Sequence, residues 1–308
     1  MRTLRLALDW TANTNHTGFF VALAKGFYTE KSIELKIITP EDDGYRTTPA
    51  KKLELNEADL ALCPLESIIS FRTKNNPFPL TAIATIFQDD VSKICVHKNS
   101  GILRPKDLDS KKYASYKARY EDHIIKSMIK NDGGNGVIEI MYPEKLGIWN
   151  TLLNREAEAT WIFDNWEGVM ARISGVELQY FTLADFDIPY SYSPVIATGE
   201  STIARYPDTL RAFIEATREG FLFAQKNPEE ATEIILPYIP KHERNRAMVL
   251  TSQHFSNKHY GNEDNWGHMD LSKVQLFYDW LHNERLETQI FYAEDTLTNA
   301  LLPVTARR

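Results

Sequence analysis

The chain has 308 residues, of which 43% are hydrophobic and 25% charged, so it is long enough and apolar enough to fold around a sizeable core. Its net charge of −7 comes from 35 basic and 42 acidic residues, and no Lys/Arg-rich run occurs, which disfavours a nucleic-acid surface. No apolar run reaches membrane-spanning length. The two cysteines, Cys63 and Cys95, lie in apolar strand-like surroundings, which predicts buried thiols and no cysteine zinc site.

Strand and helix signals alternate along the first part of the chain, which favours βα units and mostly parallel sheets. Leu4, Leu6 and Leu8 alternate with polar residues as in a strand. Thr48 and Pro49 are a typical helix cap and first-turn pair. We expect strands at residues 4–8, 33–38, 59–63 and 80–87, and helices beginning near residues 19, 49 and 64.

The middle of the chain repeats this alternation and predicts a second lobe. Strands are expected at residues 93–97, 137–141, 159–163 and 176–181, and helices at 121–130, 143–154 and from 165. Residues 189–198 are extended and return to the first lobe, and everything after Pro207 has a helical pattern. The predicted fold is therefore α/β with two lobes, two crossover strands and a helical C-terminal tail. Lobe 1 comprises residues 1–92 and 194–308, and lobe 2 residues 93–193.

The first candidate site is the polar turn that follows the first strand. It contains Trp10, Asn13, Asn15 and His16 and runs directly into a helix. In α/β proteins ligands bind where the carboxyl ends of strands meet such turns. We therefore expect these side chains to contact a ligand, with His16 hydrogen-bonding a ring acceptor. The alternative is that they only cap and solvate the turn.

Further candidates lie at later strand ends. Asp164, Trp166 and Glu167 stand at the junction of the strand 159–163 with its helix, although a helix dipole or core packing also explains them. Tyr190 and Tyr192 lie between two prolines and, in an extended segment, share one face. Aromatic faces suit a flat heterocycle. The remaining candidates are Tyr116, which precedes the helix at 121–130, and Glu66, which follows the third strand.

Familiar enzyme motifs are absent from the sequence. It contains no G-x-S-x-G, Walker A or G-x-G-x-x-G pattern, and the glycine-rich residues 133–136 precede a strand, which predicts a turn. His254 and His259 are five residues apart, a spacing that disfavours a helical metal site. We expect no metal and no cofactor.

The string from Asp9 to Gly18, D-W-T-A-N-T-N-H-T-G, closely resembles the opening of thiamine-pyrimidine-precursor binding proteins, which are related to the fungal hydroxymethylpyrimidine phosphate synthases. Shorter similar stretches occur at residues 25–28, 57–61, 206–213 and 226–229, so the resemblance spans roughly residues 4–235. It implies a type II periplasmic-binding-protein-like fold and an aminopyrimidine ligand. The binding proteins deliver such ligands to an ABC transporter, whereas the synthases consume a histidine and lysine-bound pyridoxal phosphate.

The chain departs from the synthase pattern at two places. By register, the lysine and histidine positions are Cys63 and Ser67, and the cysteine-rich motif is replaced by Tyr190, Ser191, Tyr192 and Ser193. A Schiff base requires an amine, which a cysteine does not supply. We therefore expect non-catalytic binding of a thiamine-related aminopyrimidine in a cleft between the lobes, with a synthase-like enzyme as the alternative. A binder of another small anion or sulfonate is a second alternative, which Arg46 and Arg119 keep open.

The binding hypothesis gives each candidate residue a role. Trp10 and Tyr190 would stack on the ring, and Asn15 and His16 would hydrogen-bond its nitrogens or substituents. Glu66, Asp164 or Glu167 would accept from an exocyclic amine, as a charge-assisted pair. The expected partners are the pyrimidine and, for an exported chain, an ABC transporter permease. The sequence starts without a signal peptide, so we expect a cytoplasmic protein if Met1 is native, and a periplasmic or extracellular one if the chain is a trimmed mature form.

Overall fold

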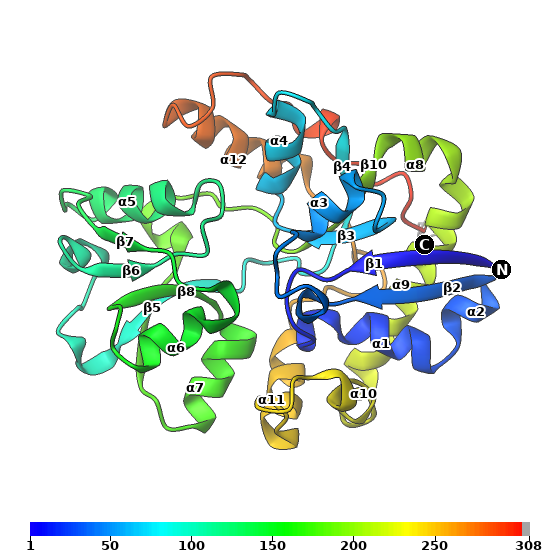
Figure 1. Ribbon diagram of the computed structural model, residues 1–308, viewed down its shortest axis with the longest axis horizontal. Helices are drawn as coiled ribbons and strands as arrows, with labels where there is room; N and C mark the ends of the chain where they lie inside the picture. Colours follow the sequence, from blue (N-terminus) through cyan, green and yellow to red (C-terminus); the bar gives the residue numbers. More distant parts are fainter. Residues whose placement is uncertain (304–308) are drawn as a thin grey trace. The chain divides into compact units, whose positions relative to one another are not determined.

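A computed structural model describes residues 1–303 of the chain, which divide into two compact units (Figure 1). Unit 1 contains Met1–Asp90, Tyr192–Val274 and the described part of the segment that begins at Tyr292. Unit 2 contains Val91–Ser191 and Gln275–Phe291. The whole C-terminal tail was expected to belong to lobe 1, whereas the structure groups Gln275–Phe291 with unit 2.

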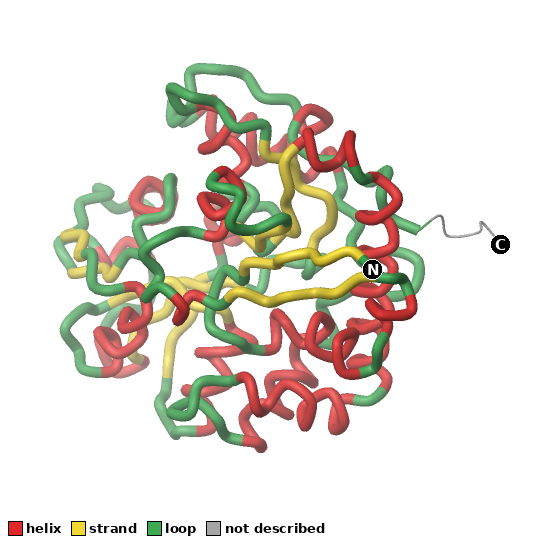
Figure 2. Tube along the Cα trace, turned by 45° about the vertical axis from the view of Figure 1, so that its right-hand side comes forward, coloured by secondary structure: helices red, strands yellow, loops and turns green. Residues whose placement is uncertain are grey.

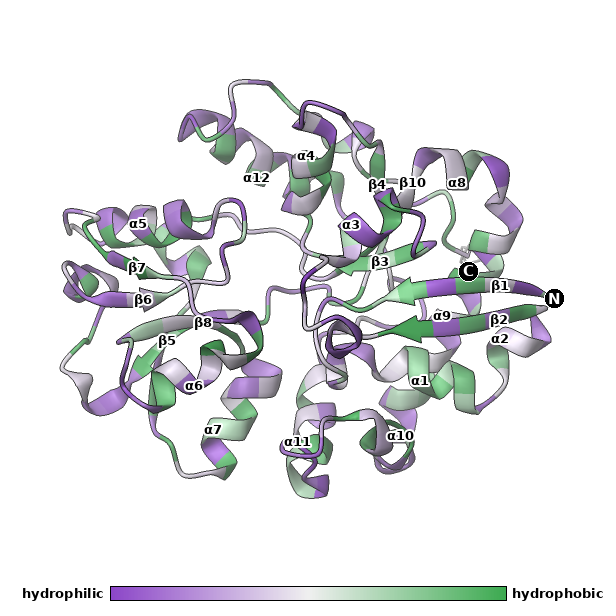
Figure 3. Ribbon diagram, viewed as in Figure 1, coloured by the Kyte–Doolittle hydropathy of each residue, from purple (hydrophilic) through white to green (hydrophobic). Residues whose placement is uncertain are grey.

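Unit 1 is built on a five-stranded sheet in the order β2-β1-β3-β10-β4. The strands are β1 (Arg2–Ala7), β2 (Ile33–Ile38), β3 (Leu60–Cys63), β4 (Leu80–Thr85) and β10 (Val195–Gly199). Strands β1, β2 and β3 are parallel, and β10 is antiparallel to both β3 and β4. Apolar and polar residues alternate along β1 and β2 (Figure 3). This alternation buries Leu4 and Leu6 in the core.

Helices lie on both sides of the unit 1 strands (Figure 2). They are α1 (Thr17–Ala24), α2 (Phe27–Glu30), α3 (Pro49–Glu54), α4 (Glu66–Thr73), α8 (Glu200–Arg205), α9 (Pro207–Lys226), α10 (Pro228–Ile235) and α11 (Arg246–Ser256). The predicted cap is confirmed, since the Thr48 side chain accepts the Lys51 N–H at the start of α3. Helices α1 and α9 cross closely at Gly18 and Gly220, where a Cβ on Gly220 would lie 2.0 Å from the Gly18 carbonyl oxygen.

Unit 2 contains a second five-stranded sheet in the order β7-β6-β8-β5-β9. The strands are β5 (Ser92–His97), β6 (Lys112–Ala114), β7 (Glu139–Met141), β8 (Ala159–Phe163) and β9 (Leu178–Phe181). Strand β5 is antiparallel to β8 and β9, and β6 is parallel to β7 and β8. The helices are α5 (Glu121–Asn131), α6 (Ile148–Leu153) and α7 (Val169–Ile173). Helix α12 (Leu271–Asn283) begins in unit 1 and continues into unit 2.

The predicted elements have counterparts in the structure except towards the C-terminus, whereas strand β6 and helix α2 were not expected. Residues 284–303 are not helical throughout: they are mostly irregular, with a short 3-10 turn at Ala293–Asp295 and a bridge between Leu297 and Ala82. Helix α8 was not expected. Residues 164–168 form a short π-helical turn before α7. Within residues 1–303, no helix is both long and apolar enough to span a bilayer.

Candidate functional site

The turn after β1 presents Trp10 at the carboxyl end of the unit 1 sheet. Its indole is half-buried and lies against Tyr45, with ring centroids 5.7 Å apart and planes inclined by 54°. The Tyr45 hydroxyl donates to the backbone oxygen of Asp9. Tyr45 has a left-handed backbone with φ of +59°, a conformation that is uncommon for a bulky residue and often marks a functional position. An aromatic pair therefore stands at this edge.

His16 and Asn13 hold the turn together from inside unit 1. His16 is fully buried, with Nδ1 3.2 Å from the Asn13 N–H and Nε2 2.8 Å from Oδ1 of Asp9. The Asn13 side chain accepts the Asn15 N–H and donates to the Thr11 carbonyl. Both residues were expected to contact a ligand. In the structure they form a capping box, so their polar atoms take part in hydrogen bonds within the turn, and a contact with a ligand stays a prediction.

A buried set of hydroxyl groups ties the same turn to α11. The Thr14 hydroxyl lies 2.6 Å from that of Ser252 and 2.9 Å from that of Ser256, and the Thr17 hydroxyl donates to Gln253. Tyr260 donates to the Thr14 carbonyl. Buried polar groups need such partners, and once satisfied they specify one arrangement. The sequence shows no local signal for these contacts, because they join segments far apart in the chain.

The end of β3 adds a thiol and a carboxylate to the same edge. Cys63 and Glu66 are both buried, and Glu66 begins α4, where an acidic residue is favourable. Burial, together with the charges of Asp9 and Glu66, raises the pKa of the Cys63 thiol. Since β1 and β3 are parallel neighbours, their carboxyl ends meet there. Asp9, Trp10, Tyr45, Cys63 and Glu66 together form what we call the unit 1 edge.

In unit 2, the junction of β8 with the following turn is occupied by internal contacts. Asp164 pairs with Arg172 at 2.7 Å, and Glu167 accepts the Phe163 N–H at 3.0 Å. Trp166 is only 1% exposed, and its indole N–H has no acceptor among residues 1–303. The structure therefore buries the Trp166 side chain in the core of unit 2, within the short turn at residues 164–168.

Tyr190 and Tyr192 have separate surroundings, although they were expected to share a face. Tyr190 packs edge-on against Trp161 and Phe277 in unit 2. In unit 1, the Tyr192 hydroxyl accepts the Asp270 N–H at 3.0 Å, and Lys273 lies over its ring. The division between the units falls between residues 191 and 192, and this stretch precedes the regular strand β10. Two-residue alternation therefore does not apply.

Tyr116 lies beside a buried carboxylate that was not expected from the sequence. Glu121, the first residue of α5, accepts the Tyr116 and Ala118 N–H groups and the Tyr113 hydroxyl. Burial raises the pKa of Glu121. Its position after a strand and at a helix start was the available signal. Tyr45 was also missed, because nothing local marks a tyrosine that lies after β2 in an irregular segment.

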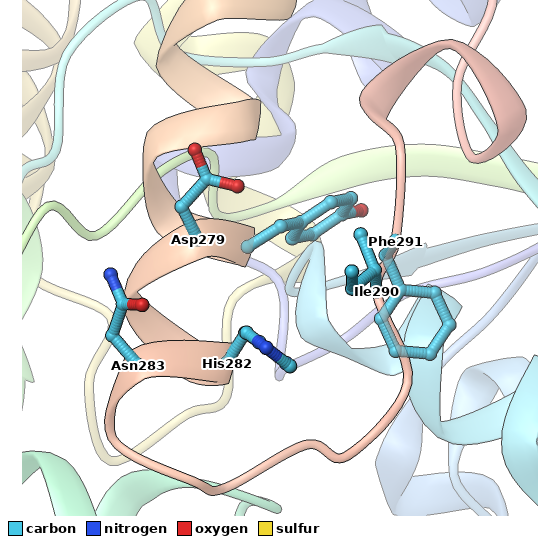
Figure 4. Close-up of a pocket in the computed structure, with 6 residues that line it drawn as sticks. Asp279, His282, Asn283, Ile290 and Phe291 are labelled. Carbon is cyan, nitrogen blue, oxygen red and sulfur yellow. The ribbon is translucent and has the colours of Figure 1, made fainter.

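A cavity of about 320 Å³ lies elsewhere in unit 2, between α12 and the segment that follows it (Figure 4). None of the predicted site residues lines it. Its walls are Tyr278, Asp279, His282, Asn283, Ile290 and Phe291. Within residues 1–303, no three His, Cys, Asp or Glu side chains are grouped in a way that would hold a metal ion.

Comparison with known proteins gives the family. The sequence profile described as NMT1/THI5 like matches residues 13–231, more than half of the chain. The chain belongs to the NMT1/THI5-like family. It is 21% identical over 291 residues to the formylaminopyrimidine-binding protein of Halalkalibacterium halodurans, covering 91% of this chain and 87% of that protein. It is 24% identical over 251 residues to the 4-amino-5-hydroxymethyl-2-methylpyrimidine phosphate synthase of Legionella pneumophila, covering 77% and 73%.

The fold of this NMT1/THI5-like protein is also found in a solved binding protein. The alkanesulfonate-binding protein SsuA from Xanthomonas axonopodis pv. citri, bound to MOPS, matches with a TM-score of 0.71 and 10% identity, over 96% of this chain and 98% of that one. Each of the two sheets contains one antiparallel strand, β10 in unit 1 and β5 in unit 2. This arrangement is that of a mixed α/β periplasmic-binding-protein fold. The expected family and fold class are confirmed.

Proposed function

We propose that this protein binds a thiamine-related aminopyrimidine without transforming it, and that the unit 1 edge grips the heterocycle. The observation that carries the proposal is the half-buried indole of Trp10, held against Tyr45 beside the carboxylates of Asp9 and Glu66. A flat ring stacks on an aromatic face at small entropic cost. The formylaminopyrimidine-binding relative supports this ligand class.

The charge of the unit 1 edge favours an amine over an acid. Asp9 and Glu66 both act on the Cys63 thiol, so two carboxylates lie near the place where the ring would sit. A carboxylate accepts from an exocyclic amine or a protonated ring nitrogen in a charge-assisted hydrogen bond. The same carboxylates repel a sulfonate, because like charges nearby disfavour binding. The alkanesulfonate-binding protein shares its fold with this chain. The carboxylates of the unit 1 edge disfavour a sulfonate ligand here.

The chemistry at the end of β3 favours binding over synthesis. In the register of the family resemblance, the lysine of the synthases falls at Cys63 and their histidine at Ser67. Cys63 is buried and burial raises its pKa, so it offers neither an amine nor a ready thiolate. Incubation with pyridoxal phosphate followed by borohydride tests the alternative. A stoichiometric trapped adduct would favour the synthase.

An ABC transporter permease is the partner that a binding role implies, and we include it in the proposal. Delivery to an outward-facing permease requires export of the chain, whereas retention inside the cell would make the protein a pyrimidine carrier or sensor. Fractionation of the native host with an antibody against the chain distinguishes the two locations.

Calorimetry tests the ligand class directly. We expect formylaminopyrimidine and 4-amino-5-hydroxymethyl-2-methylpyrimidine to bind with one site per chain, and MOPS, as a sulfonate probe, not to bind. Native mass spectrometry of protein purified from its own host should show a retained mass of the same class. Binding of MOPS without binding of either pyrimidine would refute the proposal.

A further inference from the structure

We infer that His16 is a positioning residue that, as a neutral imidazole protonated on Nε2, orients Asp9 and through it the Trp10–Tyr45 pair. This deepens the proposed function and rests on it, since the pair is the proposed stacking surface. His16 was expected to touch a ligand, but its geometry indicates a different task.

The tautomer follows from the partners of the ring. The Asn13 backbone N–H is only a donor, and it points at Nδ1 over 3.2 Å, so Nδ1 must accept. A neutral imidazole with an accepting Nδ1 carries its proton on Nε2. Nε2 lies 2.8 Å from Oδ1 of Asp9, an acceptor. His16 therefore accepts from the turn on one side and donates to Asp9 on the other.

Burial makes this arrangement rigid. The His16 side chain is 0% exposed and that of Asp9 14% exposed. A hydrogen bond to a carboxylate in such surroundings is stronger than one in water. The carboxylate of Asp9 is thereby held in one direction.

The orientation of Asp9 is transmitted to the aromatic pair by the backbone. The Asp9 carbonyl accepts the Tyr45 hydroxyl, and Trp10 is the next residue, with its ring 5.7 Å from that of Tyr45. The bond from the buried His16 ring to the Asp9 carboxylate resists displacement of Asp9 as a whole. A shift of the Asp9 backbone would move both the carbonyl that anchors Tyr45 and the Cα from which the Trp10 side chain projects. Positioning by this route differs from general support of the fold, which the Thr14 and Thr17 contacts with α11 supply.

Two measurements on the ligand-free protein test the inference. Nitrogen-15 spectra of labelled histidine should show His16 as the Nε2–H tautomer. Fluorine spectra of 5-fluorotryptophan-labelled protein, with the Trp10 resonance assigned from a Trp10→Phe variant, should show that resonance displaced in His16→Leu. His16→Gln, which retains a donor to Asp9, should leave it near its original position. Thr17→Val, the matched control at the start of α1, should also leave it in place.

Asp9→Ala removes the carboxylate that accepts the His16 Nε2–H. It provides the same test if His16→Leu does not fold. This variant should displace the Trp10 resonance, while the His16 ring keeps its hydrogen bond from the Asn13 N–H. With formylaminopyrimidine as probe, His16→Leu or Asp9→Ala should raise Kd about tenfold or more, the size expected for losing a hydrogen bond to a charged group. His16→Gln should restore most of the affinity.

The outcomes separate the two proposals. An Nδ1–H tautomer, or a Trp10 resonance that neither His16→Leu nor Asp9→Ala moves, overturns the positioning role whatever the ligand does. A wild-type protein that binds no pyrimidine, yet shows the expected tautomer and displacements, overturns the proposed function and leaves the positioning role supported.

Discussion

Trp10 and Tyr45 form an aromatic pair between two segments of unit 1, with ring centroids 5.7 Å apart and planes inclined by 54°. Trp10 follows β1, and Tyr45 lies in the irregular segment after β2. Because β1 and β2 are parallel neighbours, these two segments leave the sheet at the same edge. The pair is therefore a product of sheet topology, and it provides the surface that the proposed ligand would contact.

Trp10→Ala should weaken aminopyrimidine binding by about 1–3 kcal/mol, the scale of stacking between a base and an aromatic ring. The indole is half-buried, so the fold should survive its removal. Calorimetry measures the change, with the exposed Tyr292→Ala as an aromatic control that should bind normally. Unchanged affinity in Trp10→Ala would remove this residue from the site.

Tyr45→Phe should lower the free energy of unfolding by about 0.5–1.5 kcal/mol, because it deletes one hydrogen bond to the Asp9 carbonyl and keeps the ring. Denaturant titration measures the effect. A variant as stable as the wild type would mean that solvent replaces the lost donor at no cost.

Gly220→Ala should destabilise unit 1 by about 1–3 kcal/mol or more, the usual cost of overpacking. Alanine gains about 1 kcal/mol in helix propensity. That gain is outweighed, because the new Cβ would lie 2.0 Å from the Gly18 carbonyl oxygen, a backbone atom that has little freedom to move. Gly147→Ala, where no atom lies within 4 Å of the added Cβ, is the control and should change stability little. Thermal unfolding of both variants tests the difference.

Glu287→Ala should destabilise unit 2 by roughly 1.5–3 kcal/mol, the worth of a hydrogen bond to a charged group. Its buried carboxylate accepts the Tyr120 hydroxyl at 2.6 Å and pairs with Arg119, which ties the segment after α12 to the start of α5. Glu284→Ala, an exposed neighbour, should change stability by less than about 0.5 kcal/mol. Equal effects of the two substitutions on the unfolding midpoint would contradict this account.

Glu121 should make stability depend on pH in a defined direction. Burial raises the pKa of Glu121 in the folded protein above its ordinary value of 4.5. Its contribution to stability is therefore fully present below pH 4.5 and is lost as pH rises through the folded pKa. The free energy of unfolding of wild type, minus that of Glu121→Gln, should decrease from pH 4.5 towards neutral pH. A difference that stays constant over this range would show that the pKa of Glu121 is not raised.

Much of the fold follows from local patterns. Alternation placed β1 and β2, and Thr48 with Pro49 marked the start of α3. The candidate turn at Trp10 was also found locally, since a strand that ends in a polar turn before a helix is a short-range signal. The hydrogen-bond partners of the side chains in that turn could not be predicted locally. A histidine in a sequence does not reveal whether its ring faces Asp9 or solvent.

The sequence by itself determined the alternating strands and helices, the buried cysteines and the family, because periodicity, capping and a ten-residue motif act over short distances. Only the tertiary structure decided that His16 turns inward to Asp9, that Trp166 is core, and that Tyr45 stands beside Trp10. It also decided that Gln275–Phe291 joins unit 2 through contacts such as Glu287 with Tyr120. The physical reason is that burial and hydrogen-bond partners depend on which distant segments of the chain come into contact. A local sequence pattern does not determine these contacts.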